Sequence, residues 1–168
     1  MKKRVAVISL FVALAALLLA TVPAASPALT LNPYEQQLVK IINQKRVQHG
    51  LAKVGIHAKL VTAAQSHSAD MGQQQYFQHN SSSGEIWSSR LIRYGYTQSG
   101  YSVWRTGENI FKISGIDAAF PQNAVRAWMN SPMHRKVILT RSFRDIGVGA
   151  VMSGGTKYVT LDLGRRIQ

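Results

Sequence analysis

His79, Glu108 and His134 are among the side chains in this sequence that could do metal or proton-transfer chemistry. A neutral imidazole is a good zinc ligand, and a carboxylate can bind the ion or accept a proton from a bound water. The three residues lie too far apart in the chain to form a local ligand motif. From spacing alone, His79 is therefore a loop residue bonded to backbone, His134 a solvent-facing residue at a helix start, and Glu108 a brace for its own loop.

A serine nucleophile is the other catalytic option. Either Ser131 or Ser81 would attack the substrate, with His134 or His79 as its base. The sequence contains no Gly-x-Ser-x-Gly turn of the kind that exposes a hydrolase serine. Because Ser131 precedes Pro132 in a typical helix-cap position, we expect its hydroxyl to accept backbone amides instead.

Helices dominate the first part of the chain that must position these residues. Asn32-Pro33-Tyr34-Glu35 predicts a helix start, with an N-cap, a first-turn proline and an acid, and His49-Gly50 predicts its end. A second helix, ending near Gln75, has an apolar stripe at three- and four-residue spacing. That stripe consists of Leu60, Ala63, Ala64, His67 and Met71.

The remaining segments alternate between loops, short helices and strands. The loop 76–84 holds His79, and Glu108 directly precedes a predicted strand over 109–113. Further helices are predicted over 86–94, from Pro121 onward and over 132–139, and a hairpin of strands over 146–151 and 157–163. Helices first and antiparallel strands last indicate an α+β fold, in which helices cover a small antiparallel sheet.

Two further residues on helical stripes are interpreted as core. His67 is expected to be a satisfied buried histidine, oriented by Asp70, and Trp128 is expected to be packed in the core.

The N-terminus resembles an export signal. Met1-Lys2-Lys3-Arg4 is followed by an uncharged apolar run to Thr21, and small residues then offer peptidase sites after Ala24 or Ala28. We expect cleavage there, although an uncleaved signal anchor is the alternative. Residues 1–28 are thus interpreted as a signal peptide and 29–168 as one domain, exported to the periplasm or the exterior, with no transmembrane segment after cleavage.

The expected mature domain is strongly basic. Of the 20 Lys and Arg residues in the chain, three lie in the signal segment, which leaves 17 against 7 acidic residues and a formal charge of +10. Such an excess attracts anionic polymers or lipids, although many exported domains are basic only for solubility. The basic residues are dispersed and belong to no nucleic-acid module, and the chain has no cysteine. No partner helix or repeat is visible, so we expect a monomer.

Six short motifs, in order, resemble the bacterial branch of the CAP superfamily, also called SCP-like domains. They are Ala63-Ala64, His67-Ser68-x-Asp70-Met71, Tyr76-Phe77-x-His79, Gly107-Glu108-Asn109-Ile110, the segment from Ala124 to Arg135, and Ile146-Gly147-Val148-Gly149. The resemblance covers essentially the whole predicted domain. It implies an α-β-α sandwich, in agreement with the α+β class predicted from the pattern.

The resemblance also implies a cleft lined by two histidines and two glutamates, in which the histidines hold a divalent metal. His79, Glu108 and His134 match three of these four positions, and Ser131 stands where the second glutamate is usual. With one carboxylate missing, we expect zinc or another divalent ion to bind only weakly, through His79 and His134.

Two functions follow from this resemblance. The first is an exported module that binds an envelope polymer or lipid through its basic surface and its cleft, lined by His79, Glu108, His134 and Ser131. The second is metal-assisted hydrolysis, with Glu108 as general base and the two histidines as metal ligands. CAP domains serve many activities, so the fold alone does not choose between them.

Overall fold

The computed structural model describes residues 30–115 and 117–168. The predicted signal peptide and both predicted cleavage points, after Ala24 and Ala28, lie outside the described residues. Among the residues described, no helix has the length and apolar character needed to cross a membrane.

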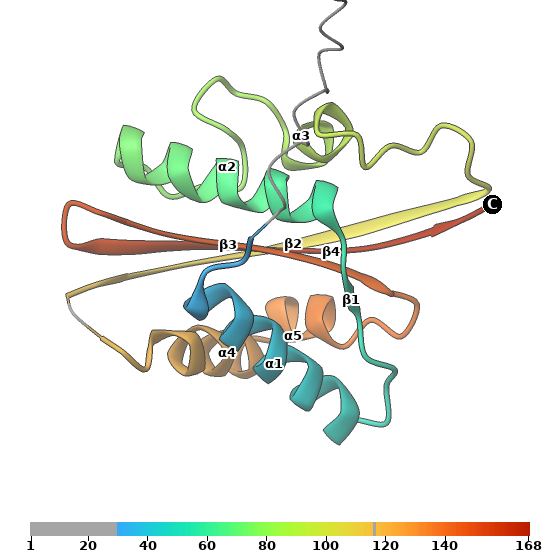
Figure 1. The fold of residues 1–168 in the computed structure, drawn as a ribbon, viewed down its shortest axis with the longest axis horizontal. Helices are drawn as coiled ribbons and strands as arrows, with labels where there is room; N and C mark the ends of the chain where they lie inside the picture. Colours follow the sequence, from blue (N-terminus) through green and yellow to red (C-terminus); the bar gives the residue numbers. More distant parts are fainter. Residues whose placement is uncertain (1–29, 116) are drawn as a thin grey trace, which may run out of the picture.

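The chain forms three layers, with a twisted sheet between two groups of helices (Figure 1). On one face lie α2 (Ala58–Gln74) and α3 (Trp87–Arg93). On the other lie α1 (Pro33–Gln48), α4 (Phe120–Asn130) and α5 (Pro132–Ile138). The predicted α-β-α sandwich is therefore confirmed.

The sheet has four strands in the order β1-β3-β4-β2. These strands are β1 (Gly55–Ile56), β2 (Val103–Ser114), β3 (Asp145–Ser153) and β4 (Thr156–Ile167). β4 is antiparallel to both β2 and β3, as predicted. The two-residue β1 runs parallel to β3, so the sheet is mixed and not purely antiparallel.

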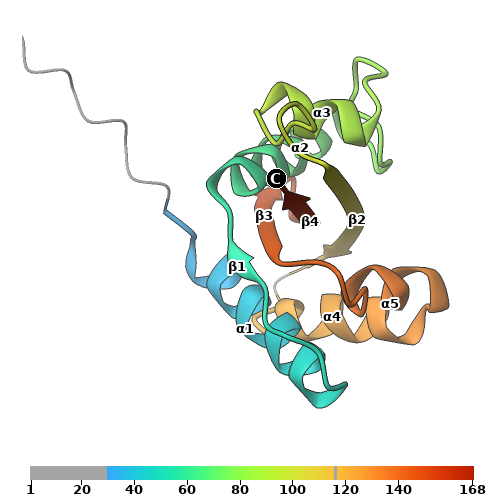
Figure 2. The ribbon, with the colours of Figure 1, turned by 90° about the vertical axis from the view of Figure 1, so that its right-hand side faces the viewer.

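Strand β2 is longer than the sequence predicts. The predicted strand began at Asn109, whereas β2 begins at Val103 and pairs with β4 along its whole length. The irregular pattern before Glu108 hides this strand because only its centre, Gly107 to Ile110, is buried. Since β2 lies at the edge of the sheet, long-range pairing and not local alternation sets its start (Figure 2).

Glycines in β3 let α2 pack directly on the sheet. A Cβ atom at Gly147 would lie 2.1 Å from the Leu60 carbonyl carbon, and one at Gly149 would lie 2.3 Å from the Ala64 carbonyl carbon. Both distances are far below van der Waals contact. The loop that follows α2 is thereby held close to the sheet.

The opposite face of the sheet carries the larger core. Trp128 of α4 is 1 % exposed, and its indole nitrogen donates to the Ile110 carbonyl at 2.9 Å. The predicted core position of Trp128 is thus confirmed. At the start of α1, Asn32 and Glu35 form the predicted capping box.

Candidate functional site

Neighbouring residues of the edge strand β2 point to opposite faces of the sheet, as strand geometry requires. Glu108 meets Arg90 of α3 on one side. Asn109 donates from Nδ2 to the backbone oxygen of His134 in α5 at 3.0 Å on the other side. Strand β2 therefore anchors both the loop that carries His79 and the helix that carries His134.

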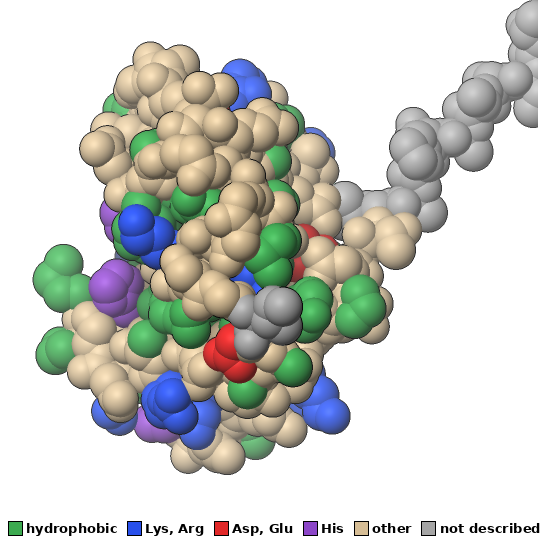
Figure 3. Space-filling view, turned by 90° about the vertical axis from the view of Figure 1, so that its left-hand side faces the viewer, with side chains coloured by type: hydrophobic (Ala, Val, Ile, Leu, Met, Phe, Trp, Pro, Cys, Tyr) green, Lys and Arg blue, Asp and Glu red, His purple; other side chains and the backbone are tan. Residues whose placement is uncertain are grey.

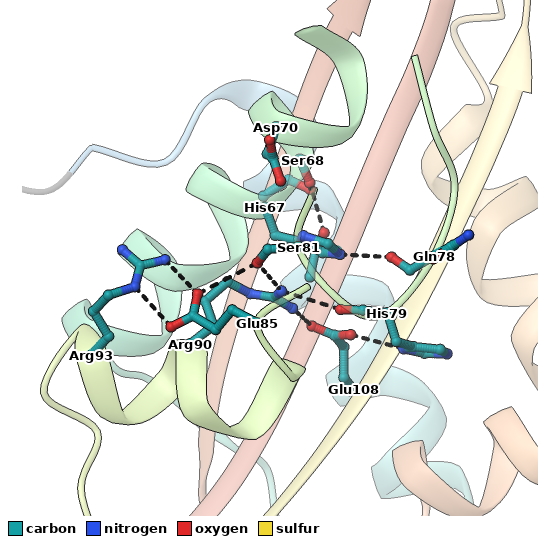
Figure 4. Close-up of polar contacts among 12 residues, drawn as sticks. His67, Ser68, Asp70, Gln78, His79, Ser81, Glu85, Arg90, Arg93 and Glu108 are labelled. Atoms are coloured by element: carbon teal, nitrogen blue, oxygen red, sulfur yellow. Dashed lines mark hydrogen bonds and ion pairs between the residues drawn. The ribbon is translucent and has the colours of Figure 1, made fainter. Parts of the chain in front are cut away.

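The carboxylate of Glu108 is held by two partners. Its Oε1 lies 2.8 Å from Nδ1 of His79, and its Oε2 is paired with the guanidinium of Arg90. The side chains of Glu108 and Arg90 are each 1 % exposed, whereas that of His79 is 45 % exposed. His79 therefore forms the solvent side of a buried charge network (Figure 4).

Arg90 also fixes the loop around His79. Its Nη1 donates to the His79 carbonyl at 3.1 Å and to the Ser81 hydroxyl at 3.0 Å. One guanidinium thus holds both the backbone of His79 and the carboxylate that contacts its ring. Sequence reasoning missed Arg90, which lies in the middle of the helix predicted over 86–94.

Asp162 lies beside this network and was also missed. It is fully buried and pairs across the sheet with Glu108. Burial, and then the negative charge of Glu108, raise the pKa of Asp162 well above its usual value. The available signal was an acid in the middle of the apolar run of β4.

His134 lies at the first turn of α5. Its Nδ1 is 2.8 Å from the hydroxyl of Ser131, which is the N-cap residue by position but makes no side-chain cap bond. The expectation that the Ser131 hydroxyl accepts backbone amides is therefore wrong, because His134 takes that hydroxyl instead. Desolvation, and then the charge of His79, lower the pKa of His134.

His67 is buried, as predicted, but no direct hydrogen bond joins it to Asp70; the hydroxyl of Tyr76 lies between them, 3.5 Å from Nδ1 of His67. The Nε2 of His67 lies 2.9 Å from the Gln78 carbonyl, whereas Asp70 accepts from the Tyr76 hydroxyl at 2.5 Å and from the backbone of Ser82 at 2.9 Å. Asp70 therefore ties down the loop that follows α2. Burial, and then the charge of Arg90, lower the pKa of His67 to about 4.

His79 and His134 are the predicted metal ligands, and each ring has one nitrogen that a divalent ion could use. Each ring uses Nδ1 for a neighbouring side chain, and neither Nε2 has a hydrogen-bond partner among the residues described. This is the usual arrangement of zinc-binding imidazoles. However, no group of three or more His, Cys, Asp or Glu side chains placed to hold a metal occurs in the described parts of the chain.

The two candidate serines are poorly arranged for nucleophilic attack. Ser131 contacts Nδ1 of His134, and no carboxylate within the described ranges hydrogen-bonds the other nitrogen of that ring. Ser81 accepts from Arg90 and lies 3.5 Å from Glu85. Neither hydroxyl therefore belongs to a catalytic triad of nucleophile, base and carboxylate.

Comparisons with known proteins identify the fold and its relatives. Residues 39–163 match the model of the cysteine-rich secretory protein family. Two proteins of Bacillus subtilis strain 168 are similar, YkwD at 35 % identity over 74 % of this chain and the membrane protein YlbC at 32 % over 79 %. The matched regions make up 45 % and 34 % of those two proteins, so this chain spans less than half of either.

Solved structures agree with this assignment. An extracellular protein with an SCP domain from Bacillus anthracis is 28 % identical with a TM-score of 0.65, over 81 % of this chain and 44 % of that one. An outer surface protein of Borrelia burgdorferi is 20 % identical with a TM-score of 0.64, over 79 % of this chain and 92 % of that one. NaASP2, solved with Zn²⁺, shares the fold at 14 % identity and a TM-score of 0.58, over 83 % of each chain.

Proposed function

The chain belongs to the cysteine-rich secretory protein family, and on that premise we propose that it is an exported module that binds an anionic polymer of the cell envelope. In this proposal the cleft at His79 and His134 is a secondary feature that holds a divalent ion weakly. The similarity to an extracellular protein of Bacillus anthracis supports an extracytoplasmic location.

The observation that carries the proposal is an excess of uncompensated positive charge. Of the seven acidic residues, Glu35, Glu108 and Asp162 are buried, whereas only three of the seventeen cationic residues of the domain are buried. Fourteen Lys and Arg side chains and four carboxylates therefore remain at least partly exposed. Over the described ranges, the surface ion pair is that of Arg93 with Glu85, and Figure 3 shows separate cationic side chains with few acidic ones.

The contacts of Glu108 weigh against the hydrolytic alternative. A general base needs a lone pair facing its substrate, but both oxygens of Glu108 are engaged and its side chain is 1 % exposed. Glu108 is better suited to orient His79, whose Nε2 then faces outward.

Substitution of His79 separates binding from hydrolysis. We expect His79→Gln to leave adsorption to isolated envelope material within about twofold, because the binding charges lie elsewhere. Adsorption and release of soluble envelope fragments are measured on the same samples. Fragment release by the wild type that disappears in His79→Gln would favour the hydrolase. Glu108→Gln is less suitable for this test, because it leaves the buried Arg90 without its anionic partner and so destabilises the fold.

Zinc titration by calorimetry tests the metal part of the proposal. Two imidazole ligands predict exchangeable binding with a dissociation constant of roughly 0.1 mM, which His79→Gln weakens at least about tenfold. The absence of heat even at millimolar zinc would contradict this part and leave the polymer-binding part intact.

A further inference from the structure

A groove of about 940 Å³ is lined by residues of α1 and α4, both polar and apolar. The two helices contact each other and lie in the same layer (Figures 1 and 2). The lining of the groove includes Ile41, Val125 and Met129, which these helices contribute near their contact. None of the residues singled out for chemistry lies in this groove.

Polar side chains edge the groove at helical spacing. Residues four apart lie above one another on a helix, so each helix contributes a polar row. The rows are Gln36, Lys40, Gln44 and Gln48 on α1, and Gln122, Arg126 and Asn130 on α4. Polar side chains therefore flank the apolar residues of the groove on both helices.

The charges of the groove are all positive. Lys40, Lys45 and Arg126 line it, and no carboxylate does. Neither lysine ammonium has a hydrogen-bond or ion-pair partner in the described part of the chain, and Arg126 donates only to the Asn123 side chain at 2.7 Å. The acid of α1, Glu35, is 1 % exposed and is occupied by backbone amides, including that of Ala150 at 3.0 Å.

The groove is also lined by side-chain amides that make no hydrogen bond among the residues that the structure describes. The side chains of five lining residues have no hydrogen bond to any other described residue, and each offers one carbonyl and one NH₂ group. These residues are Gln37, Gln44, Gln48, Gln122 and Asn130. Amides of this kind pair with hydroxyl groups, so the groove offers partners for both anions and alcohols.

The hollow continues past α1. A second hollow of about 570 Å³ shares Lys40, Gln44 and Gln48 with the groove and adds Lys53. Since α1 has 16 residues, the polar track follows a helix about 24 Å long. Such a length suits a chain of repeating units better than a small molecule.

We propose that the α1–α4 groove binds a polyol-phosphate chain, with its phosphodiesters at the cations and its hydroxyls at the amides. This inference rests on the proposed function and assigns the anionic polymer a site and a chemical class. No aromatic residue lines the groove, so it lacks the stacking surfaces on which single-stranded nucleic acids are bound.

The test measures binding of the full chain to poly(glycerol phosphate), alongside vesicles that contain anionic lipid. The variant Lys40→Gln/Arg126→Gln is compared with Arg105→Gln/Arg141→Gln, which removes the same charge from exposed positions outside the groove. We expect about a tenfold loss of polymer affinity for the groove variant and a change within about twofold for the control.

A charge-neutral substitution tests the hydroxyl contacts. Gln44→Ala should weaken binding of poly(glycerol phosphate) about threefold and leave binding of inorganic polyphosphate, which has no hydroxyls along its chain, unchanged. Equal losses on both polymers would overturn the assignment of hydroxyls to the amides.

The outcomes separate this inference from the function beneath it. Equal losses in the two double variants would overturn the groove and leave envelope binding standing. If groove substitutions reduce vesicle binding but not polymer binding, a lipid surface is the occupant and the inference fails. If the wild type binds no anionic envelope material, the proposed function fails as well.

Discussion

His79 is held so that one ring nitrogen faces inward and the other faces solvent. The Glu108 carboxylate accepts from Nδ1–H, which leaves the lone pair on Nε2 available outside. Arg90 in turn neutralises Glu108 in the protein interior, where an unpaired carboxylate would be costly. Of the three residues in this network, His79 is therefore the one whose side chain is exposed to solvent.

The buried His67 predicts an acid-sensitive fold. Its folded-state pKa is about 4, below the usual value near 6.5, so between these values the unfolded chain binds a proton that the folded protein does not. The stability present above pH 6.5 is lost as the pH falls toward 4, by roughly 2 to 3 kcal/mol from this group. Urea unfolding at several pH values measures this loss.

His67→Gln is the matched variant, because a glutamine amide can still donate to the Gln78 carbonyl. Only the wild type loses stability through His67 as the pH falls. The difference in unfolding free energy between wild type and variant should therefore be smaller at pH 4 than at pH 7. Asp162, with its raised pKa, titrates in the opposite sense and is common to both proteins. A difference that does not vary with pH would contradict the account of His67.

The site was only partly predictable at the residue scale. His79 and Glu108 could be paired by motif resemblance, because they lie in short recognisable segments. Arg90 and Asp162 could not, because a charge in a helical stripe or a strand is ordinarily assigned to the solvent side. Arg90 is paired with Glu108, and Asp162 lies opposite Glu108 across the sheet, so both positions depend on the folded chain.

At the scale of elements, the contact between α2 and β3 determines where the His79 loop lies. The Gly147-x-Gly149 spacing puts both glycines on the face of β3 that meets α2, one helical turn apart along Leu60 and Ala64. The loop that holds His79 begins at the end of α2. The close packing of α2 on β3 therefore sets the distance of this loop from the sheet.

A methyl group at Gly149 should push α2 off the sheet. We expect Gly149→Ala to lower the free energy of unfolding by about 3 kcal/mol, because its Cβ would overlap the Ala64 backbone. Thermal and urea unfolding measure the change. Gly55→Ala is the control, since the nearest atom to its Cβ is 3.9 Å away, and equal effects of the two substitutions would contradict the packing argument.

Element types were predictable, but strand limits and the parallel pairing were not. Capping residues marked α1 well, because an Asn32–Glu35 capping box is a local signal. The start of β2 and the two-residue β1 depend on partners far along the chain, Ile167 and Asp145 respectively. Patterns within a short window carry no information about such partners.

At the scale of the whole molecule, burial sharpens the charge imbalance of the sequence. Folding removes three of seven carboxylates from the surface and leaves most cations exposed. The domain therefore presents a more one-sided field than its formal charge indicates, and that field is screened within about 10 Å at 0.1 M salt. Envelope binding that relies on it must depend on ionic strength.

The most direct test measures the affinity of the full chain for isolated envelope material as a function of salt. With about three anionic groups neutralised, affinity should fall at least about tenfold between roughly 50 and 200 mM salt, as for other flexible polyanions. An affinity that stays constant across this range would contradict the central claim that uncompensated positive charge drives binding.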